Sequence, residues 1–202
     1  MESLPDYLRS LSKPRFLILR LKPIGDTVLL SPVFRNIRKL YPDAIIDVVV
    51  YPFVHDVIRH NPYVDNVIVL KRTNRAKLAF YVRSLFRRYD VVIDYINNPT
   101  SRAIALFTRS KAAIGNERAP HFIYDYRLTN REAIYSSIRC LKKLEPIGLS
   151  TFDDYRPEVF IGGEDLGKVR QFFDGMGGER KTAGIFASAK SVSYTHLTLP
   201  TN

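Results

Sequence analysis

FLILRLKPIGDTVLLSP, residues 16–32, combines the pattern of a buried strand with the start of a helix. The apolar run at its beginning, residues 16–19, is typical of a strand that is buried on both faces of a sheet. A short loop with Gly25 and Asp26 follows, where the glycine favours a tight turn or a positive φ. An apolar stripe of helical spacing then begins at Leu29. A strand that passes through a short loop into a helix is the first unit of a parallel α/β sheet.

The alternation of strands and helices continues along the chain. Strand patterns occur at residues 16–19, 45–51, 67–70, 91–93 and 112–114. Helical patterns occur near residues 29–40, 54–59, 78–85, 103–107 and 131–144. Because Pro32 lacks a backbone N–H, we expect a kink or a separate first turn in the first helix. The order predicts an α/β fold, a Rossmann-like parallel sheet with flanking helices and right-handed crossovers.

The predicted Rossmann-like domain covers residues 14–161 and follows an N-terminal extension, residues 1–13. Ligands of such sheets bind beyond the carboxyl ends of the strands. The loops expected around a site are therefore those after Leu19, Tyr51, Ile93 and Ile114. Residues 162–181, rich in glycine at both ends, predict a connector that contains a helix. Residues 182–191 have the pattern of the first strand of a second α/β domain.

The composition is that of a globular protein. The chain has 202 residues, 46% hydrophobic and 25% charged, which excludes a disordered or low-complexity chain. A single cysteine excludes a disulfide framework and a cysteine-rich metal site. No apolar run approaches the roughly 18 residues of a membrane span, and the N-terminus lacks the features of a signal peptide. We therefore expect the protein in the cytoplasm.

The charge of the chain favours an anionic partner. Basic residues number 31 and acidic residues 20, a formal net charge of +11. Between Asp65 and Asp90 there is no acidic residue, but there are seven basic ones: Lys71, Arg72, Arg75, Lys77, Arg83, Arg87 and Arg88. A helical wheel puts Lys77, Arg83, Arg87 and Arg88 opposite Leu78, Tyr81, Val82 and Leu85, with Arg75 at the border. This basic face is either an ordinary solvated surface or a surface for an anionic membrane leaflet or nucleic acid.

Asp26 has two interpretations. As an N-cap, its carboxylate accepts hydrogen bonds from the free N–H groups at the start of the helix. As a general base, it faces the cleft and takes a proton from a substrate. The two are compatible only in part, because the helix dipole keeps the carboxylate ionised but makes it a weaker base. The local sequence leaves both open.

The stretch around Asp26 resembles the opening of glycosyltransferase family 9, the ADP-heptose:lipopolysaccharide heptosyltransferases. The shared pattern is an apolar strand, an arginine, Gly-Asp, an apolar turn and a proline, here residues 16–19, Arg20, Gly25, Asp26, residues 28–30 and Pro32. Further matches follow in order at residues 41–44, 61–62, 64–65, 67–68, 89–94 and 114–115. The resemblance covers about residues 14–190.

This resemblance implies the GT-B architecture, in which two Rossmann-like domains face each other across a cleft. The chain would be the N-terminal, acceptor-binding domain, with the C-terminal nucleotide-sugar domain truncated. The implied reaction is inverting transfer of heptose from ADP-heptose to a lipopolysaccharide inner-core acceptor, at the cytoplasmic face of the inner membrane. The chain alone would be an inactive fragment. No metal is implied, because GT-B enzymes stabilise the leaving nucleotide with helix N-termini and basic side chains.

Individual residues receive expected roles from their positions and from the resemblance. Asp26 would be the catalytic base. The acceptor-binding residues would be Lys22, Gly25, Asn97 and Asn98; for the last two the alternative is an ordinary turn with helix N-caps. The donor contacts would be Ser188 and Lys190. The contacts to an anionic surface, whether a membrane or the carboxylates and phosphates of the inner core, would be Arg75, Lys77, Arg83, Arg87 and Arg88.

The sequence departs from the family in two places. No histidine occurs in the helix around Ala133, where the family often has one. Residues 192–202 have no family counterpart, and we interpret them as an artefact of the reading frame; the alternative is a genuine short strand and tail. A different class of function also stays open, a non-catalytic basic Rossmann-like module that binds an anionic membrane or nucleic acid. No RRM, KH, zinc-finger, dinucleotide or Walker A pattern is evident.

Overall fold

The computed structural model describes residues 2–21, 23–86, 88–128 and 135–175. The chain divides into two compact units after Gly162. The first unit contains a sheet of six parallel strands in the order β3-β2-β1-β4-β5-β6. The strands are β1 (Arg15–Leu19), β2 (Ile45–Val50), β3 (Asn66–Val69), β4 (Val91–Asp94), β5 (Ala112–Asn116) and β6 (Tyr126–Leu128). The predicted Rossmann-like parallel sheet is confirmed, with one strand more than the sequence pattern indicated.

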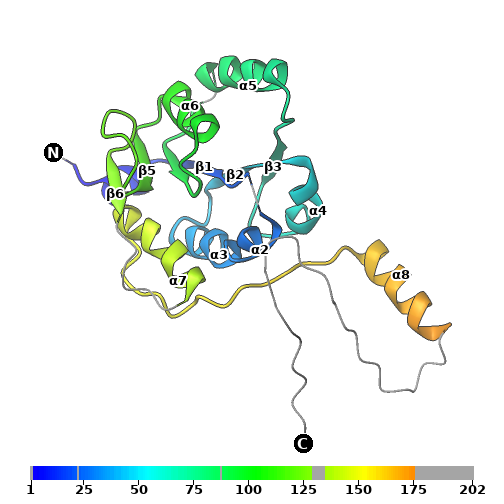
Figure 1. The fold of residues 1–202 in the computed structure, drawn as a ribbon. Helices are drawn as coiled ribbons and strands as arrows, with labels where there is room; N and C mark the ends of the chain where they lie inside the picture. Colours follow the sequence, from blue (N-terminus) through cyan, green and yellow to red (C-terminus); the bar gives the residue numbers. More distant parts are fainter. Residues whose placement is uncertain (1, 22, 87, 129–134, 176–202) are drawn as a thin grey trace, which may run out of the picture. The chain divides into compact units, whose positions relative to one another are not determined.

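Helices cover both faces of this sheet, as Figure 1 shows for α5 and α6 on one side and α3 and α7 on the other. The helices are α1 (Leu4–Ser10), α2 (Ile24–Val28), α3 (Ser31–Leu40), α4 (His55–Ile58), α5 (Asn74–Phe86), α6 (Pro99–Thr108) and α7 (Ser136–Leu141), with 3₁₀ turns η1 (Pro52–Val54) and η2 (Lys142–Ile147). In β1, Phe16 and Ile18 point into the core under α3, whereas Leu17 and Leu19 point into the core under α6. Successive strand residues alternate between faces, so burial on both sides requires the unbroken apolar runs that the sequence contains.

The chain after β1 forms two helices. Pro32 is at the second position of α3, where its missing N–H costs no intrahelical hydrogen bond, and the preceding turn is the separate helix α2. The expected separate first turn is therefore confirmed. Gly25 lies within α2 and does not have a positive φ, so the expected tight-turn role of this glycine was wrong. Asp26 lies in the first turn of α2, whose N-cap is Pro23, so the capping interpretation of Asp26 was also wrong.

Helix α5 turns its apolar stripe toward solvent. The wheel predicted an amphipathic helix, yet Leu78, Val82 and Leu85 are exposed and the buried residue of the helix is Ser84. Tyr81 is half-buried and stacks on Phe107 of α6, with ring centroids 5.6 Å apart. The described basic residues around the helix are exposed, apart from half-buried Lys77. Arg87 lies outside the described residues.

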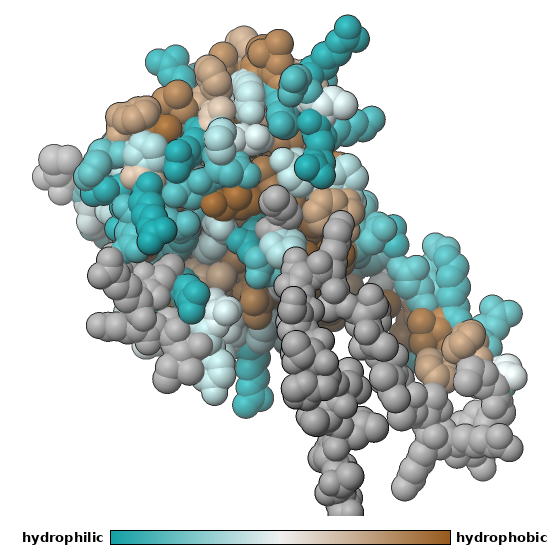
Figure 2. Space-filling view, in the orientation of Figure 1, coloured by the Kyte–Doolittle hydropathy of each residue, from teal (hydrophilic) through white to brown (hydrophobic). Residues whose placement is uncertain are grey.

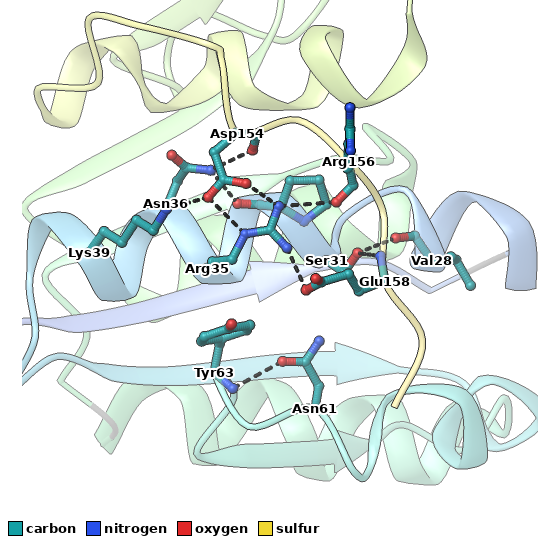
Figure 3. Close-up of polar contacts among 11 residues, drawn as sticks. Val28, Ser31, Arg35, Asn36, Lys39, Asn61, Tyr63, Asp154, Arg156 and Glu158 are labelled. Carbon is teal, nitrogen blue, oxygen red and sulfur yellow. Dashed lines mark hydrogen bonds and ion pairs between the residues drawn. The ribbon is translucent and has the colours of Figure 1, made fainter. Parts of the chain in front are cut away.

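A segment after η2 is pinned along α3 by a buried arginine (Figure 3). Arg35 Nε donates to Asp154 at 2.8 Å, its Nη1 pairs with Glu158 at 2.5 Å, and its Nη2 donates to the Arg156 carbonyl at 3.0 Å. The backbone N–H of Glu158 donates to Ser31 Oγ at 2.7 Å. These contacts, more than 100 residues apart in sequence, join the last extended segment of the unit to its third helix.

Two sequence expectations concern the ends of the chain. Residues 1–13 contain α1, whose Leu4 and Leu8 are buried in the main core. The second unit contains α8 (Gly163–Asp174), the helix expected in the connector. The expectations for residues 182–191 and 192–202 lie outside the described residues. Within the described ranges, each helix is too short or too polar to serve as a membrane span.

Candidate active site

A cavity of about 400 Å³ opens beyond the carboxyl ends of β1, β4 and β5. Successive strands are added toward one edge of the sheet from β1 to β3 and toward the other edge from β4 to β6, and doubly wound sheets bind ligands at this switch point between β1 and β4. The lining residues come from the segments after these strands and from α7 and η2, and those with charged or polar side chains include Arg20, Asp26, Asn97, Asn116, Glu117, Arg118, Ser136, Arg139 and Lys143. The loops after Leu19, Ile93 and Ile114 contribute as expected, whereas the loop after Tyr51 is not part of the lining.

Asp26 stands at the cavity with its carboxylate held by an arginine. The guanidinium of Arg20, which follows β1 directly, forms an ion pair with the Asp26 carboxylate. The same guanidinium donates through Nη1 to the carbonyl oxygen of Tyr95 at 2.7 Å. The Asp26 side chain is 44% exposed, whereas that of Arg20 is 13% exposed. The carboxylate is therefore accessible from the cavity, and its direction is set by a nearly buried cation.

The turn after β4 is organised by the buried carboxylate of Asp94. Its Oδ1 accepts from the backbone N–H groups of Ile96 and Asn97 at 2.7 and 3.0 Å. Its Oδ2 accepts from the hydroxyl of Tyr124 at 2.5 Å. Burial and the adjacent Asp94 carboxylate raise the pKa of the Tyr124 hydroxyl. Asn97 has the left-handed φ of 58°, which asparagine tolerates better than most residues. This turn presents the Tyr95 carbonyl to Arg20.

Lys143 brings a buried ammonium group to the cavity. Its Nζ donates to the Asp94 carbonyl oxygen and lies 4.7 Å from the centre of the Tyr95 ring. Burial lowers the pKa of Lys143 from 10.5 to about 8, although the Asp94 carboxylate opposes this shift. Burial also raises the pKa of the neighbouring Cys140 thiol, which is consistent with a packed thiol. An ammonium group desolvated in this way is stabilised when an anion binds nearby.

The cavity combines more positive than negative charge with hydrogen-bonding groups. Its lining carries four cationic side chains, Arg20, Arg118, Arg139 and Lys143, and two acidic ones, Asp26 and Glu117. Amide and hydroxyl groups of Asn97, Asn116 and Ser136 lie among them. Cavities of this size hold small ligands and sugar units. The arrangement suits a polyhydroxylated ligand with an anionic group, placed beside an accessible carboxylate.

The expected site residues fall into three groups. Asp26 and Asn97 line the cavity. Gly25 is exposed beside it, with open space where a Cβ would lie, and Asn98 caps α6 by accepting from the Ser101 N–H at 2.9 Å, so the alternative interpretation of Asn98 as a helix cap is confirmed. Lys22, Ser188 and Lys190 lie outside the described residues.

Sequence reasoning missed three basic residues of the cavity, Arg118, Arg139 and Lys143. One signal was available for Lys143, since it lies between Leu141 and Leu144, which are both buried in the main core. A lysine among core positions is rarely buried without a partner or a ligand. No local signal distinguishes Arg118 or Arg139 from ordinary surface arginines, because the long-range contacts of the sheet bring them to the cavity.

The Lys143 ammonium predicts a pH-dependent stability. Because the folded pKa lies below the unfolded value, the unfolded state binds more protons between about pH 8 and 10.5, and the free energy of unfolding rises with pH across that window. Lys143→Met removes the buried charge, so we expect it to be roughly 2–3 kcal/mol more stable than the parent at pH 7. The gain should vanish by pH 10.5. Urea unfolding of the parent and of Lys143→Met at several pH values measures this gain. A stability difference between the two proteins that does not change with pH contradicts the lowered pKa of Lys143.

The fold and the cavity define a Rossmann-like α/β domain with a cavity at its switch point. Among solved structures, the same fold forms half of glycosyltransferase family 9 proteins. The crystal structure of the family 9 glycosyl transferase from Veillonella parvula DSM 2008 matches with a TM-score of 0.70 and 19% identity, over 81% of this chain and 50% of that chain. E. coli ADP-heptose lps heptosyltransferase II matches with a TM-score of 0.61 and 17% identity, over 81% and 50%. E. coli heptosyltransferase WaaC with ADP-2-deoxy-2-fluoro heptose matches with a TM-score of 0.58 and 18% identity, over 69% and 50%.

This likeness is one of structure. No protein-family model and no curated protein matches the sequence. The chain spans about half the length of the solved structures that it matches. The resemblance to glycosyltransferase family 9 that the Gly25-Asp26 stretch indicated is thus confirmed at the level of the fold.

Proposed function

We propose that this chain is the acceptor-binding half of an inverting glycosyltransferase that transfers heptose from ADP-heptose to a lipopolysaccharide inner-core sugar. The observation that carries the proposal is the accessible Asp26 carboxylate, which Arg20 holds at the cavity by the switch point of the sheet. The structural likeness to family 9 supports the reaction class. The donor nucleotide would bind to a second lobe, which corresponds to the other half of the matched structures.

Asp26 is the general base of the proposed reaction. The acceptor hydroxyl gives its proton to the Asp26 carboxylate while its oxygen bonds to the anomeric carbon of the heptose. The bond between that carbon and the ADP phosphate oxygen breaks on the opposite face, and ADP leaves with the electron pair. General bases of this kind contribute about 10²–10⁴ in rate. Arg20 is the positioning residue, because its bond to the Tyr95 carbonyl fixes the direction from which it holds Asp26.

The cavity binds the acceptor sugar. Asn97 and Asn116 supply amide groups for sugar hydroxyls, and Lys143 with Arg139 attracts an anionic group of the acceptor. This excess of positive charge agrees with an inner-core acceptor, which carries carboxylates and phosphates. Of the four acceptor-binding residues expected from the sequence, the proposal retains Asn97 as a cavity residue and Gly25 as an open position beside it.

We further propose that the protein acts at the cytoplasmic face of the inner membrane. The support is the cluster of basic residues at 71–88, with no acidic residue among them. The second candidate, a non-catalytic basic module, rests on this charge alone. It offers no role for the accessible carboxylate beside the cavity, and we therefore favour the enzyme.

The test separates acceptor binding from transfer. We expect residues 1–202 alone to bind an inner-core oligosaccharide but not to consume ADP-heptose, because the proposed donor lobe is the missing half. Saturation-transfer NMR measures the first and release of ADP the second. The same chain joined to a family 9 donor lobe should release ADP only when the acceptor is present. ADP release by residues 1–202 alone, or no acceptor binding by them, contradicts the proposal.

A further inference from the structure

Helix α5 exposes an apolar stripe that no described part of the chain covers. Leu78 is 64% and Phe86 82% exposed, and Val82 and Leu85 are about half exposed between them. The spacing i, i+4, i+7 and i+8 places these four side chains on one side of the helix. We call these residues, Leu78, Val82, Leu85 and Phe86, the α5 stripe. Ser84 and the half-buried Phe80 and Tyr81 attach the other side of the helix to the domain.

The neighbouring helix extends the apolar surface. Leu106 and Phe107 of α6 are exposed as well, and the stacking of Phe107 on Tyr81 ties α6 to α5. Figure 2 shows hydrophobic residues gathered over the region of α5 and α6, with hydrophilic side chains beside them. A contiguous exposed apolar surface rimmed by polar residues marks an interaction site more often than chance exposure.

Basic side chains surround the α5 stripe. Arg75 falls within the angular range of the stripe, Arg83 lies next to it, and Lys71, Arg72 and Arg88 flank the two ends of the helix; all five are exposed. No acidic residue occurs anywhere from residue 66 to residue 89. Leucine and phenylalanine flanked by lysine and arginine on one helix surface is the composition of helices that lie in a lipid–water interface.

We propose that α5 docks the protein on an anionic lipid bilayer. The α5 stripe enters the boundary between headgroups and acyl chains, while Arg75 and Arg83 contact lipid phosphates. This deepens the proposed function, and rests on it for the idea that the acceptor is attached to a membrane lipid. A second copy of the chain fits the surface less well, because two basic faces repel each other. Nucleic acid leaves the apolar stripe without a role.

The chain offers a clean probe of insertion, because it contains no tryptophan. Phe86→Trp places a single indole on the α5 stripe, and Phe122→Trp places one at an exposed position outside α5 and α6 as the matched control. With vesicles of phosphatidylcholine and phosphatidylglycerol (3:1), we expect the emission of Phe86→Trp to shift to the blue and to be quenched by brominated acyl chains. Phe122→Trp should not respond. Vesicles of phosphatidylcholine alone should give a much weaker response.

Co-sedimentation with the same vesicles tests separately the apolar and the basic residues of the docking surface. We expect Leu78→Ser with Phe86→Ser to weaken binding at least tenfold, and Arg75→Glu with Arg83→Glu to weaken it by more, with loss of its salt dependence. The control Phe122→Ser with Lys13→Glu, both exposed positions elsewhere, should bind as the parent does. All of these side chains are exposed, and circular dichroism should report an unchanged fold.

Three outcomes overturn the docking proposal. They are an emission of Phe86→Trp that vesicles do not change, equal binding to neutral and anionic vesicles, and a concentration-dependent dimer that Phe86→Ser dissolves. Transfer to a lipid-free acceptor by the two-lobed form is the separate readout for the proposed function, and Leu78→Ser with Phe86→Ser should leave it unchanged. A parent protein that transfers heptose to the lipid-free acceptor but does not bind anionic vesicles therefore contradicts only the docking proposal, and a parent that binds the vesicles but transfers no heptose contradicts only the enzyme.

Discussion

Asp26→Asn in the two-lobed form should lower the rate of heptose transfer about 10²–10⁴-fold without unfolding the protein. The amide keeps the size of the carboxylate and still accepts a hydrogen bond from Arg20, but it does not take a proton from the acceptor hydroxyl. The fold should persist because the side chain is 44% exposed and packs in neither hydrophobic core. Initial rates of acceptor-dependent ADP release measure the effect.

The control for this experiment is Asp43→Asn. Asp43 is an exposed aspartate between α3 and β2, away from the residues that line the cavity, and its change should leave the rate within a factor of two to three. Acceptor binding by Asp26→Asn should stay close to that of the parent, because the base acts on the bound hydroxyl. Transfer at the parent rate would remove Asp26 from the mechanism and favour the non-catalytic basic module.

Arg35→Met should lower the free energy of unfolding by about 3–4 kcal/mol. The guanidinium is buried and satisfies the Asp154 and Glu158 carboxylates and the Arg156 carbonyl. Methionine fills the volume but removes the Arg35 donors from all three acceptors. The segment after η2 then keeps only its other contacts with α3, from Lys39 and Asn36 to Asp154 and from the Glu158 N–H to Ser31. Urea unfolding gives the size of the loss, and faster amide exchange at residues 150–160 should report the loosened segment.

Lys39→Met is the matched control. Lys39 also pairs with Asp154, at 2.5 Å, but its side chain is 61% exposed, so its removal should cost less than about 1 kcal/mol. The hydrogen bond from Arg35 lowers the pKa of Asp154, so the contribution of this pair is present above the unfolded pKa of 3.8 and is lost as the pH falls through the lower folded value. The difference between parent and Arg35→Met should therefore shrink below pH 3.8. A similar loss of unfolding free energy in Arg35→Met and Lys39→Met would mean that the buried ion pairs of Arg35 stabilise the protein no more than an exposed pair does.

Much of the fold could be predicted because the information is local. A strand buried on both faces needs an unbroken apolar run, and the runs in β1, β2, β4 and β5 contrast with the helical spacing between them. Because Pro32 has no backbone N–H, it does not fit in the middle of a continuous helix. The structure has the separate helix α2 before it and places Pro32 in the first turn of α3. The position of Asp26 at a cavity followed from the rule that parallel α/β sheets bind ligands beyond the carboxyl ends of their strands.

Other features have no local signal. β6 has only three residues, too few to show the alternation of buried and exposed side chains that identifies a strand in a sequence. It forms because Ile114 to Asn116 of β5 offer it a parallel partner. The helix expected over 131–144 is described as α7 and the 3₁₀ turn η2, which contains Pro146, and residues 131–134 lie outside the described ranges. Helix α5 has an apolar stripe, but the sequence pattern does not say that this stripe faces away from the domain.

By itself the amino-acid order determined the parallel α/β sheet, the order of its elements and the aspartate after the first strand, because periodicity and proline chemistry act between near neighbours. Tertiary structure alone decided that Arg20 would hold Asp26, that Lys143 would be buried against the Asp94 carbonyl and that α5 would show its leucines to solvent. These outcomes depend on contacts such as those of Arg20 with Tyr95 and of Lys143 with Asp94, which are 75 and 49 residues apart, or on the packing of one helix against another. Burial and long-range hydrogen bonds, which set the direction of a side chain and the charge of a cavity, exist only once the chain has folded.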